Sequence, residues 1–272
     1  MQLPRILYTD LSKYTFTGPD VESGYSLYNL NNYNRNSTVR FLDASGTLQY
    51  LIIDTGNTLA KNAIVLDNVN FDTCMDAGTI RLESSTSDDF VDAFRYDGLF
   101  LEDYTKSLFM SFPETTRRYF RLCFDGTMTS KCEIGNIFIS KLLKFNFPYL
   151  YGYKKDNYEY KTNDTVTISG LLRASNAGYE KLVNEFNFKF QTDSVKNEFI
   201  DFIKCVRGKA YPFYFTDSDG TTTYVHMAND YTPAMVESFN LSAISNLTMK
   251  GELTDAVLEL PYEDITEDEL IL

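Results

Sequence analysis

Short apolar segments separated by turn residues fill most of the first half of the chain. β-Branched and aromatic residues dominate these segments, and Gly, Asp, Asn or Ser bounds each one, which is typical of a β-sandwich rather than of a helical or βαβ fold. The segments cover residues 50–56, 63–66, 79–84, 118–126 and 132–140. The pattern predicts one jelly-roll sandwich, with its entry strands and loops in residues 1–48.

The second half has a different pattern. Residues 181–191 alternate between apolar and polar side chains, with Asn184 as the polar exception on the inner face. A helix follows, which Thr192 or Asp193 can cap and Gly208 can end. Its apolar positions have helical spacing and are Val195, Phe199, Phe202, Ile203 and Val206. The spacing predicts a helix over 193–207, then a hairpin over 211–227 and two more strands. The fold class is therefore mainly β: a jelly-roll sandwich, then a second β-sandwich domain with one helix.

Three ranges follow from this organisation: a jelly-roll domain over 1–148, a second β domain over 149–254 and an acidic tail over 255–272. Pro148 and Gly152 interrupt the pattern at the boundary. An aromatic run at the boundary is too apolar for a free linker, and the tail ends in three apolar residues, so we expect both to contact neighbours. The interface candidates are Phe145, Phe147, Tyr149, Tyr151, Tyr153, Leu270, Ile271 and Leu272.

Charge and hydropathy exclude several classes of partner. The net charge is −13, and the sequence contains no extended cluster of Lys and Arg, so we expect no specific binding of nucleic acid. No apolar stretch is long enough for a transmembrane helix, and the first residues lack the apolar core of a secretory signal. Tyrosine is frequent in predicted loops, for example at Tyr28 and Tyr33, and tyrosine is enriched at binding surfaces.

The four cysteines are Cys74, Cys123, Cys132 and Cys205, and none forms a C-x-x-C pair. Zinc ribbons and thioredoxin-like sites are therefore not expected. We expect buried, reduced thiols. Cys123 and Cys132 flank one predicted turn and could face each other across a hairpin, so whether these two pair stays open.

Catalytic residues are scarce. His226 is the single histidine and lies in a predicted strand, where a nucleophilic triad is not expected. The acidic pairs, such as Asp88 with Asp89, are adjacent in sequence and would point to opposite faces of a strand. The turn at 217–220 fails as an EF-hand, because Thr222 and Ala228 stand where Gly and Glu are needed. We expect no enzyme, no cofactor and no metal site.

The order of segments resembles two known modules. The segment 24–30 precedes the strand at 51–56, then come the strand at 79–84 and the pair at 118–124 and 133–139. This order is similar to that of the discoidin-like (galactose-binding-like) modules found in tailed-phage tail and baseplate proteins. In the second half, the order of two strands, a helix, a hairpin and two strands resembles the tail-tube-like domain of phage distal-tail and tube proteins.

The resemblance implies a structural component of a tailed-phage virion, at the distal tail, tail tip or baseplate hub, assembled in the host cytoplasm. It implies a ring of six copies that joins the tube to the tip, with other tail proteins as partners. It also allows a structural calcium ion, although the sequence assigns no ligands to it. The alternative is a carbohydrate- or receptor-binding module of a virion or cell surface. An exposed aromatic platform with convergent polar groups would favour the alternative, because the fold alone does not settle function.

Overall fold

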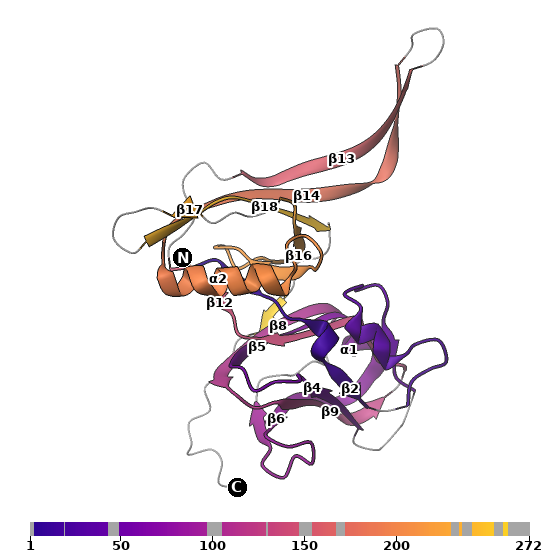
Figure 1. Ribbon diagram of the computed structural model, residues 1–272. Coiled ribbons are helices and arrows are strands. Elements are labelled where there is room, and N and C mark those ends of the chain that lie inside the picture. Colours follow the sequence, from indigo (N-terminus) through magenta and orange to yellow (C-terminus); the bar gives the residue numbers. More distant parts are fainter. Residues whose placement is uncertain are drawn as a thin grey trace. The chain divides into compact units, whose positions relative to one another are not determined.

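A computed structural model describes residues 3–18, 20–42, 49–96, 105–128, 130–146, 154–166, 172–229, 234–235, 241–252 and 258–260. The chain is mainly β, as predicted, and forms two compact units (Figure 1). The first unit comprises Leu7–Leu142 with Asp255–Leu272, and the second comprises Met1–Ile6 with Leu143–Thr254.

The first unit contains a five-stranded and a four-stranded sheet. The five-stranded sheet has the order β2 (Thr15–Thr17), β4 (Gln49–Asp54), β9 (Tyr119–Met128), β6 (Met75–Ser85) and β7 (Phe94–Tyr96). The four-stranded sheet has the order β11 (Asn136–Ser140), β5 (Lys61–Asn70), β8 (Thr105–Thr115) and β19 (Leu258–Leu260). A short ladder joins β3 (Val39–Arg40) to β10 (Glu133–Ile134). All the described pairs are antiparallel except β19 with β8.

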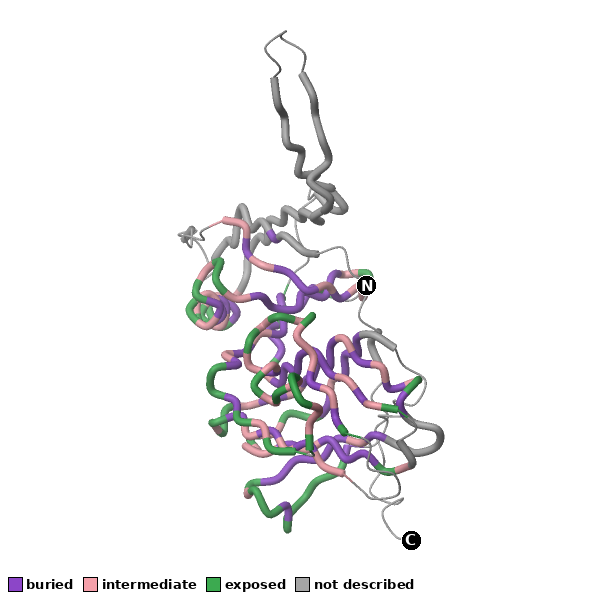
Figure 2. The backbone as a smooth tube through the Cα atoms, turned by 90° about the vertical axis from the view of Figure 1, so that its right-hand side faces the viewer, coloured by how far each residue is buried: buried purple, intermediate pink, exposed green. Residues whose placement is uncertain are grey.

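Aromatic side chains join the two sheets into a sandwich. The ring of Phe112, on β8, lies 4.7 Å from the ring of Tyr96 and 6.0 Å from that of Phe120, and both of these residues belong to the other sheet. Alternate residues of β4, such as Leu51 and Ile53, are fully buried between the sheets. The alternation predicted from the sequence therefore points one face of each strand into a shared core. Figure 2 shows this buried band running through the first unit.

The second unit contains one eight-stranded sheet. Its order is β12 (Leu143–Lys144), β1 (Arg5–Leu7), β15 (Phe213–Thr216), β16 (Thr222–Met227), β18 (Leu241–Glu252), β14 (Leu172–Thr192) and β13 (Lys154–Val166), and β17 (Ala234–Met235) pairs with β18. Strand β14 is long, and with β13 it forms a hairpin that extends past the other strands of this sheet (Figure 1).

Helix α2 (Asp193–Cys205) begins where the sequence predicts and ends two residues earlier than expected. The Thr192 hydroxyl oxygen accepts a hydrogen bond from the backbone N–H of Val195, which caps the first turn. The predicted apolar stripe is buried except for Ile203, which is half-buried, and the ring of Phe202 lies 4.8 Å, edge-on, from that of Phe213 on β15. Gly208 follows the helix with a φ of +64°, a conformation that favours glycine.

Strand pairing explains where the units divide. The expected boundary was at 148/149, whereas the second unit starts at Leu143 because β12 pairs with β1 near the N-terminus, with Ile6 opposite Leu143. Residues 255–272 were expected to be a separate acidic tail. Of this range the structure describes Leu258–Leu260, which form β19 beside β8 in the first unit. Short elements that the sequence did not predict are α1 (Phe71–Cys74) and the 3-10 helices η1 (Leu11–Lys13) and η2 (Leu27–Asn31).

Candidate functional site

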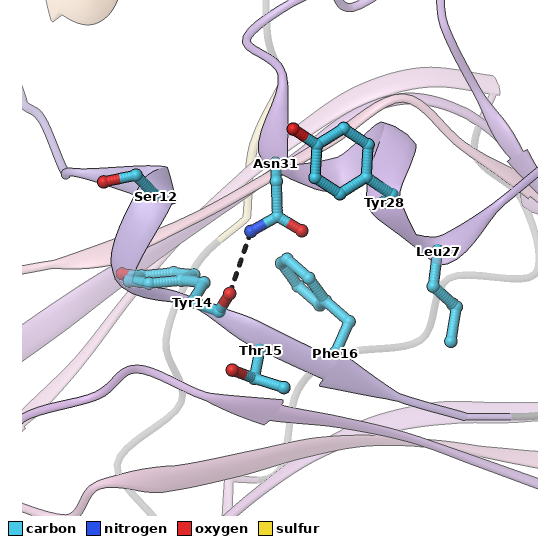
Figure 3. Close-up of a pocket in the computed structure, with 7 residues that line it drawn as sticks. All are labelled: Ser12, Tyr14, Thr15, Phe16, Leu27, Tyr28 and Asn31. Carbon is cyan, nitrogen blue, oxygen red and sulfur yellow. Dashed lines mark hydrogen bonds between the residues drawn. The ribbon is translucent and has the colours of Figure 1, made fainter.

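A pocket of about 420 Å³ lies in the first unit, between the two 3-10 helices and the edge strand β2. Figure 3 shows its lining, which consists of Ser12, Tyr14, Thr15, Phe16, Leu27, Tyr28 and Asn31. The volume is within the range of about 300–1,000 Å³ that is typical of small-molecule sites. An edge strand and two short turns thus enclose a ligand-sized space.

Side-chain caps fix both turns that wall the pocket. Asp10 accepts a hydrogen bond from the backbone N–H of Ser12 at 3.2 Å, which starts η1. Ser26 accepts one from the backbone N–H of Tyr28, also at 3.2 Å, which starts η2. Asp and Ser are among the best capping residues because their short side chains reach the free N–H groups of the first turn. The lining residues therefore stand on anchored backbone.

The amide of Asn31 is held in one orientation. Its Nδ2 donates to the carbonyl oxygens of Leu11 and Tyr14, each at 2.8 Å. Because both acceptors lie on the same side of the amide, the nitrogen must face them, and Oδ1 faces the opposite side. Figure 3 shows Oδ1 directed toward the space between the rings of Phe16 and Tyr28. The pocket thus presents a fixed hydrogen-bond acceptor.

Aromatic rings surround this acceptor. Tyr28 is 74% exposed. Phe16 is half-buried, and its ring lies 6.2 Å from that of Tyr14. Tyr14 is buried, and its hydroxyl accepts from Thr9 and donates to the carbonyl oxygen of Ile139. Tyr14 therefore forms a rigid wall, while Tyr28 offers a free ring face.

The chemistry of the pocket suits a neutral, hydroxylated ligand. None of the seven lining side chains is charged, and hydroxyl groups from Ser12, Thr15 and Tyr28 accompany the Asn31 amide. No His, Cys, Asp or Glu contributes to the lining. Within the described residues, no group of three or more such side chains could hold a metal ion. The pocket can hold a ligand by stacking and hydrogen bonding, without a nucleophile or a general acid.

The sequence-predicted interface residues do not meet in this pocket. Phe145 is fully buried inside the second unit, where its ring lies 6.2 Å from that of Phe199. The other candidates lie outside the described residues: Phe147, Tyr149, Tyr151, Tyr153, Leu270, Ile271 and Leu272. His226 is half-buried in β16 and its ring is 6.3 Å from that of Tyr224. None of the described helices is long and apolar enough to cross a membrane.

The cysteine expectations need correction. Cys74 and Cys132 form a disulfide, so these two are not reduced thiols, and Cys132 does not pair with Cys123. The reason is the register of two strands. Met75, at the start of β6, pairs with Met128, at the end of β9, which brings the neighbouring residue Cys74 close to the chain that leaves β9. Cys123 lies in the middle of β9, where burial raises the pKa of its thiol to about 12.

The pocket residues were not identified from the sequence. Tyr28 stood out only as a loop tyrosine in a turn-rich stretch, and nothing in the sequence linked it to Asn31 or Phe16. The two turns are three and five residues long, which is too short for a periodic signal. A Ser or Asp cap followed by an aromatic residue was the available signal, because exposed aromatic residues on capped turns are candidate contacts.

Comparisons with known proteins add likenesses in fold. No protein family and no curated relative matches the chain. Similar solved structures include the family 32 carbohydrate-binding module of Clostridium perfringens NanJ in complex with galactose, with 9% identity, a TM-score of 0.41 and coverage of 49% of this chain and 98% of that module. Another Clostridium perfringens module, bound to GalNAc-β-1,3-galactose, has 11% identity, a TM-score of 0.41 and coverage of 49% and 99%. The family 32 module of AlyQ, bound to 4,5-unsaturated mannuronic acid, has 19% identity, a TM-score of 0.37 and coverage of 46% and 92%.

Proposed function

We propose that the first unit binds a neutral glycan and that the pocket between η1, β2 and η2 holds one of its sugar rings. The observation that carries the proposal is the fixed Asn31 Oδ1 between an exposed Tyr28 ring and Phe16. A sugar ring has an apolar C–H face and a rim of hydroxyl groups. The face can pack on an aromatic ring while a hydroxyl donates to a fixed oxygen.

The roles of the residues differ. Tyr28 supplies the stacking surface, and its exposure leaves one ring face free for ligand. Asn31 Oδ1 accepts a hydrogen bond from a sugar hydroxyl, and Nδ2 donates none to the sugar, because both of its N–H groups are used within the fold. The Ser12 hydroxyl donates to the Asp10 carboxylate and is therefore held within the fold. Binding of this kind requires no covalent chemistry, so the protein acts as a binding module and not as an enzyme.

The disulfide supports an extracellular or surface location. Disulfides persist in oxidising surroundings and are rare in the cytosol. The bond between Cys74 and Cys132 therefore fits a module exposed where glycans are displayed, on a cell or on a virion. The sequence-based expectation of a virion protein that is assembled in the host cytoplasm is compatible with this location if the bond forms after release.

The test is glycan binding by the full chain and by two matched variants. Tyr28→Ala removes the exposed ring, whereas Phe94→Ala removes another exposed ring, 45% exposed on β7, outside the pocket. Binding to a panel of immobilised neutral glycans is followed by calorimetry on any glycan that is retained. We expect Tyr28→Ala to lower affinity at least about tenfold, a loss of about 1.4 kcal/mol, and Phe94→Ala to bind normally. Equal binding by the two variants, or no glycan retained by the intact chain, would reject the proposal.

A second candidate function rests on the hairpin of the second unit. We also propose that the chain assembles with its own copies into a ring, and with tube, tip or hub proteins of a phage tail. Strands β13 and β14 pair as far as Val166 with Leu172, whereas the pairing of β14 with β18 stops at Lys181 with Glu252. In the described part of the chain, residues 162–166 and 172–176 thus pair only with each other. A lone two-stranded ribbon is marginal in water, so a partner would stabilise it.

Mass photometry of the purified chain tests this assembly. We expect a multiple of the 31.2 kDa chain for the intact protein, and smaller particles when residues 162–176 are replaced by an Asn-Gly turn. A control variant with the alanine substitution Tyr28→Ala keeps the ribbon and should assemble normally. A monomer at micromolar concentration for the intact chain would reject ring assembly while leaving glycan binding open.

A further inference from the structure

A buried ammonium group sits inside a set of oxygen atoms at one end of the first unit. The side chain of Lys61, the first residue of β5, is nearly inaccessible, since the residue is 3% exposed. Its Nζ donates to the carbonyl oxygens of Asn57 at 3.0 Å, Leu59 at 2.8 Å and Arg117 at 3.3 Å. The side-chain oxygen of Asn57 is a fourth acceptor, at 3.3 Å. We refer to these four oxygens as the oxygen cage.

The cage has more oxygens than a lysine needs. An ammonium group has three N–H donors, whereas four oxygens lie within 3.3 Å of this one. Carbonyl oxygens that converge on one point replace the hydration shell of a cation, as in channels that select potassium. Oxygens that converge in this way are typical of an ion site. In this protein the ammonium group of Lys61 occupies the space between them.

We propose that the oxygen cage is a monovalent-cation site whose resident cation is the ammonium of Lys61, and that it takes up potassium or a small alkylammonium ion when that group is removed. Three backbone carbonyls and one amide oxygen make the cage neutral. Ca²⁺ prefers six to eight oxygens at about 2.3–2.6 Å, usually with carboxylates, and Mg²⁺ prefers still shorter distances. The spacing of about 3 Å and the neutral donors therefore favour an ion of ammonium size over either divalent ion.

Two opposing effects act on the charge of Lys61. Burial lowers the pKa of Lys61 to about 8, and the charge of Asp54 opposes that effect. The group therefore still carries its proton at pH 7. Withdrawing an ammonium group from water is costly unless oxygens replace the water, and the cage supplies them.

The position of the cage gives the cation a structural role. Residues 55–60 connect β4 of one sheet to β5 of the other, and Arg117 lies in the connection from β8 back to β9. The ammonium thus joins two chain crossings between the sheets. Neighbouring contacts reinforce them, since the Thr55 hydroxyl donates to the carbonyl oxygen of Arg118 at 2.8 Å. Removal of the cation takes the ammonium donor from the carbonyl oxygens of Leu59 and Arg117, one at each crossing, whereas the Asn57 carbonyl oxygen keeps the Thr55 hydroxyl as a donor at 3.2 Å.

The test is chemical rescue of Lys61→Ala in the full chain at pH 7. This variant empties both the oxygen cage and the space that the methylene groups of Lys61 occupy. Lys61→Met fills the space of the methylene groups with an uncharged chain of similar length. The unfolding midpoint of each is measured in choline chloride, KCl, CaCl₂ and n-propylammonium chloride at equal ionic strength. Lys141→Ala, which removes a half-exposed lysine, is the matched control.

We expect Lys61→Ala and Lys61→Met to lower the midpoint by about 5–10 °C in choline chloride. Propylammonium, and to a smaller extent K⁺, should restore at least about half of that loss in Lys61→Ala and none in Lys61→Met. If Lys61→Ala is unfolded at 25 °C, its folding is titrated with propylammonium instead. Rescue by CaCl₂ alone, equal rescue by choline, or no rescue by any cation would overturn the proposal.

Discussion

Removing the disulfide between Cys74 and Cys132 should weaken the first unit and leave the second unit unchanged. Cys74 ends α1 just before β6, and Cys132 lies between β9 and β10. Both partners are fully buried, and both belong to the first unit. The double variant Cys74→Ser with Cys132→Ser makes the change permanent, and reduction of the native protein makes it reversible.

The size of the effect follows from the length of the closed loop. The two cysteines are 58 residues apart. A cross-link over that length removes about 14 cal/mol/K of chain entropy from the unfolded state, or about 4 kcal/mol at 25 °C. Serine in place of buried cysteine adds the cost of a hydroxyl in an apolar site, about 1–3 kcal/mol for each unsatisfied group. Reduction alone should therefore cost about 4 kcal/mol, and the double variant somewhat more.

The assay is urea unfolding followed by tyrosine fluorescence, because the chain has 20 Tyr and no Trp. Two units can unfold in two transitions, so the analysis fits both. Cys205→Ser is the control, since Cys205 lies in α2 of the second unit. Peptide mapping without reduction must recover the 74–132 cross-link. A link between Cys123 and Cys132, or a first-unit transition that reduction does not move, would refute the reasoning.

Four further outcomes test other parts of the structure. Phe199→Ala should cost the second unit about 3–5 kcal/mol, because the ring is 1% exposed, and only the second-unit transition should move in urea. Gly56→Ala should destabilise more than Gly24→Ala: both have positive φ, but a Cβ at Gly56 would lie 2.7 Å from a backbone oxygen of η1, whereas at Gly24 nothing lies within 4 Å. Cys123 should resist alkylation at pH 8 in the folded protein and react in urea, because its thiol is buried and has a pKa of about 12.

The fourth outcome concerns acid: hydrogen bonds from the side chains of Ser85 and Thr86 lower the pKa of Asp92 to about 2, so the stability that its ionised form adds is complete above about pH 4 and is lost as the pH falls toward 2. The loss should be smaller in Asp92→Asn, as measured by urea unfolding at pH 2, 3 and 4.

Local signals in the sequence predicted some of the regular elements, but not β8 or the start of β13. Helix α2 follows from the spacing of Val195, Phe199 and Phe202 and from a cap at its first turn, and both act within a few residues. Strand β14 follows from period-two alternation over 181–191. Such patterns are readable because the side chains that share a face are close together in the chain.

The pocket could not be predicted for the opposite reason. Asn31 is a useful acceptor only because its Nδ2 reaches the carbonyl oxygens of Leu11 and Tyr14, which are 20 and 17 residues away. Those contacts depend on how η2 lies against η1, and neither turn is long enough to carry a pattern. The sequence identified Tyr28 as a tyrosine in a predicted loop, but it did not show that Asn31 and Phe16 lie beside it.

The possible pairing of Cys123 with Cys132 is wrong because residues that are close in the sequence need not be close in the fold. Eight residues lie between Cys123 and Cys132, and a simple hairpin would place the two cysteines together. In the structure β9 continues to Met128, so Cys123 stays in the middle of a paired strand. Cys74 reaches Cys132 because the register of β6 with β9 brings their ends together. With four cysteines three complete pairings are open, and sequence alone does not choose among them.

The disulfide and the Lys61 ammonium both hold connections between the sheets in place, at opposite ends of β5. The connections that cross between the sheets of a sandwich leave the strand ladders and are more mobile than the strands they join. β5 starts at Lys61, where the ammonium joins the β4–β5 and β8–β9 crossings. The chain that leaves the other end of β5 runs through α1 to Cys74, where the disulfide joins the β5–β6 crossing to the chain after β9. At each end of β5, the connection between the sheets is therefore bonded to a second segment of the chain. If so, losses from the double serine variant and from Lys61→Met should add, since the two sites share no contact, and a strongly non-additive result would show that the ends are not independent.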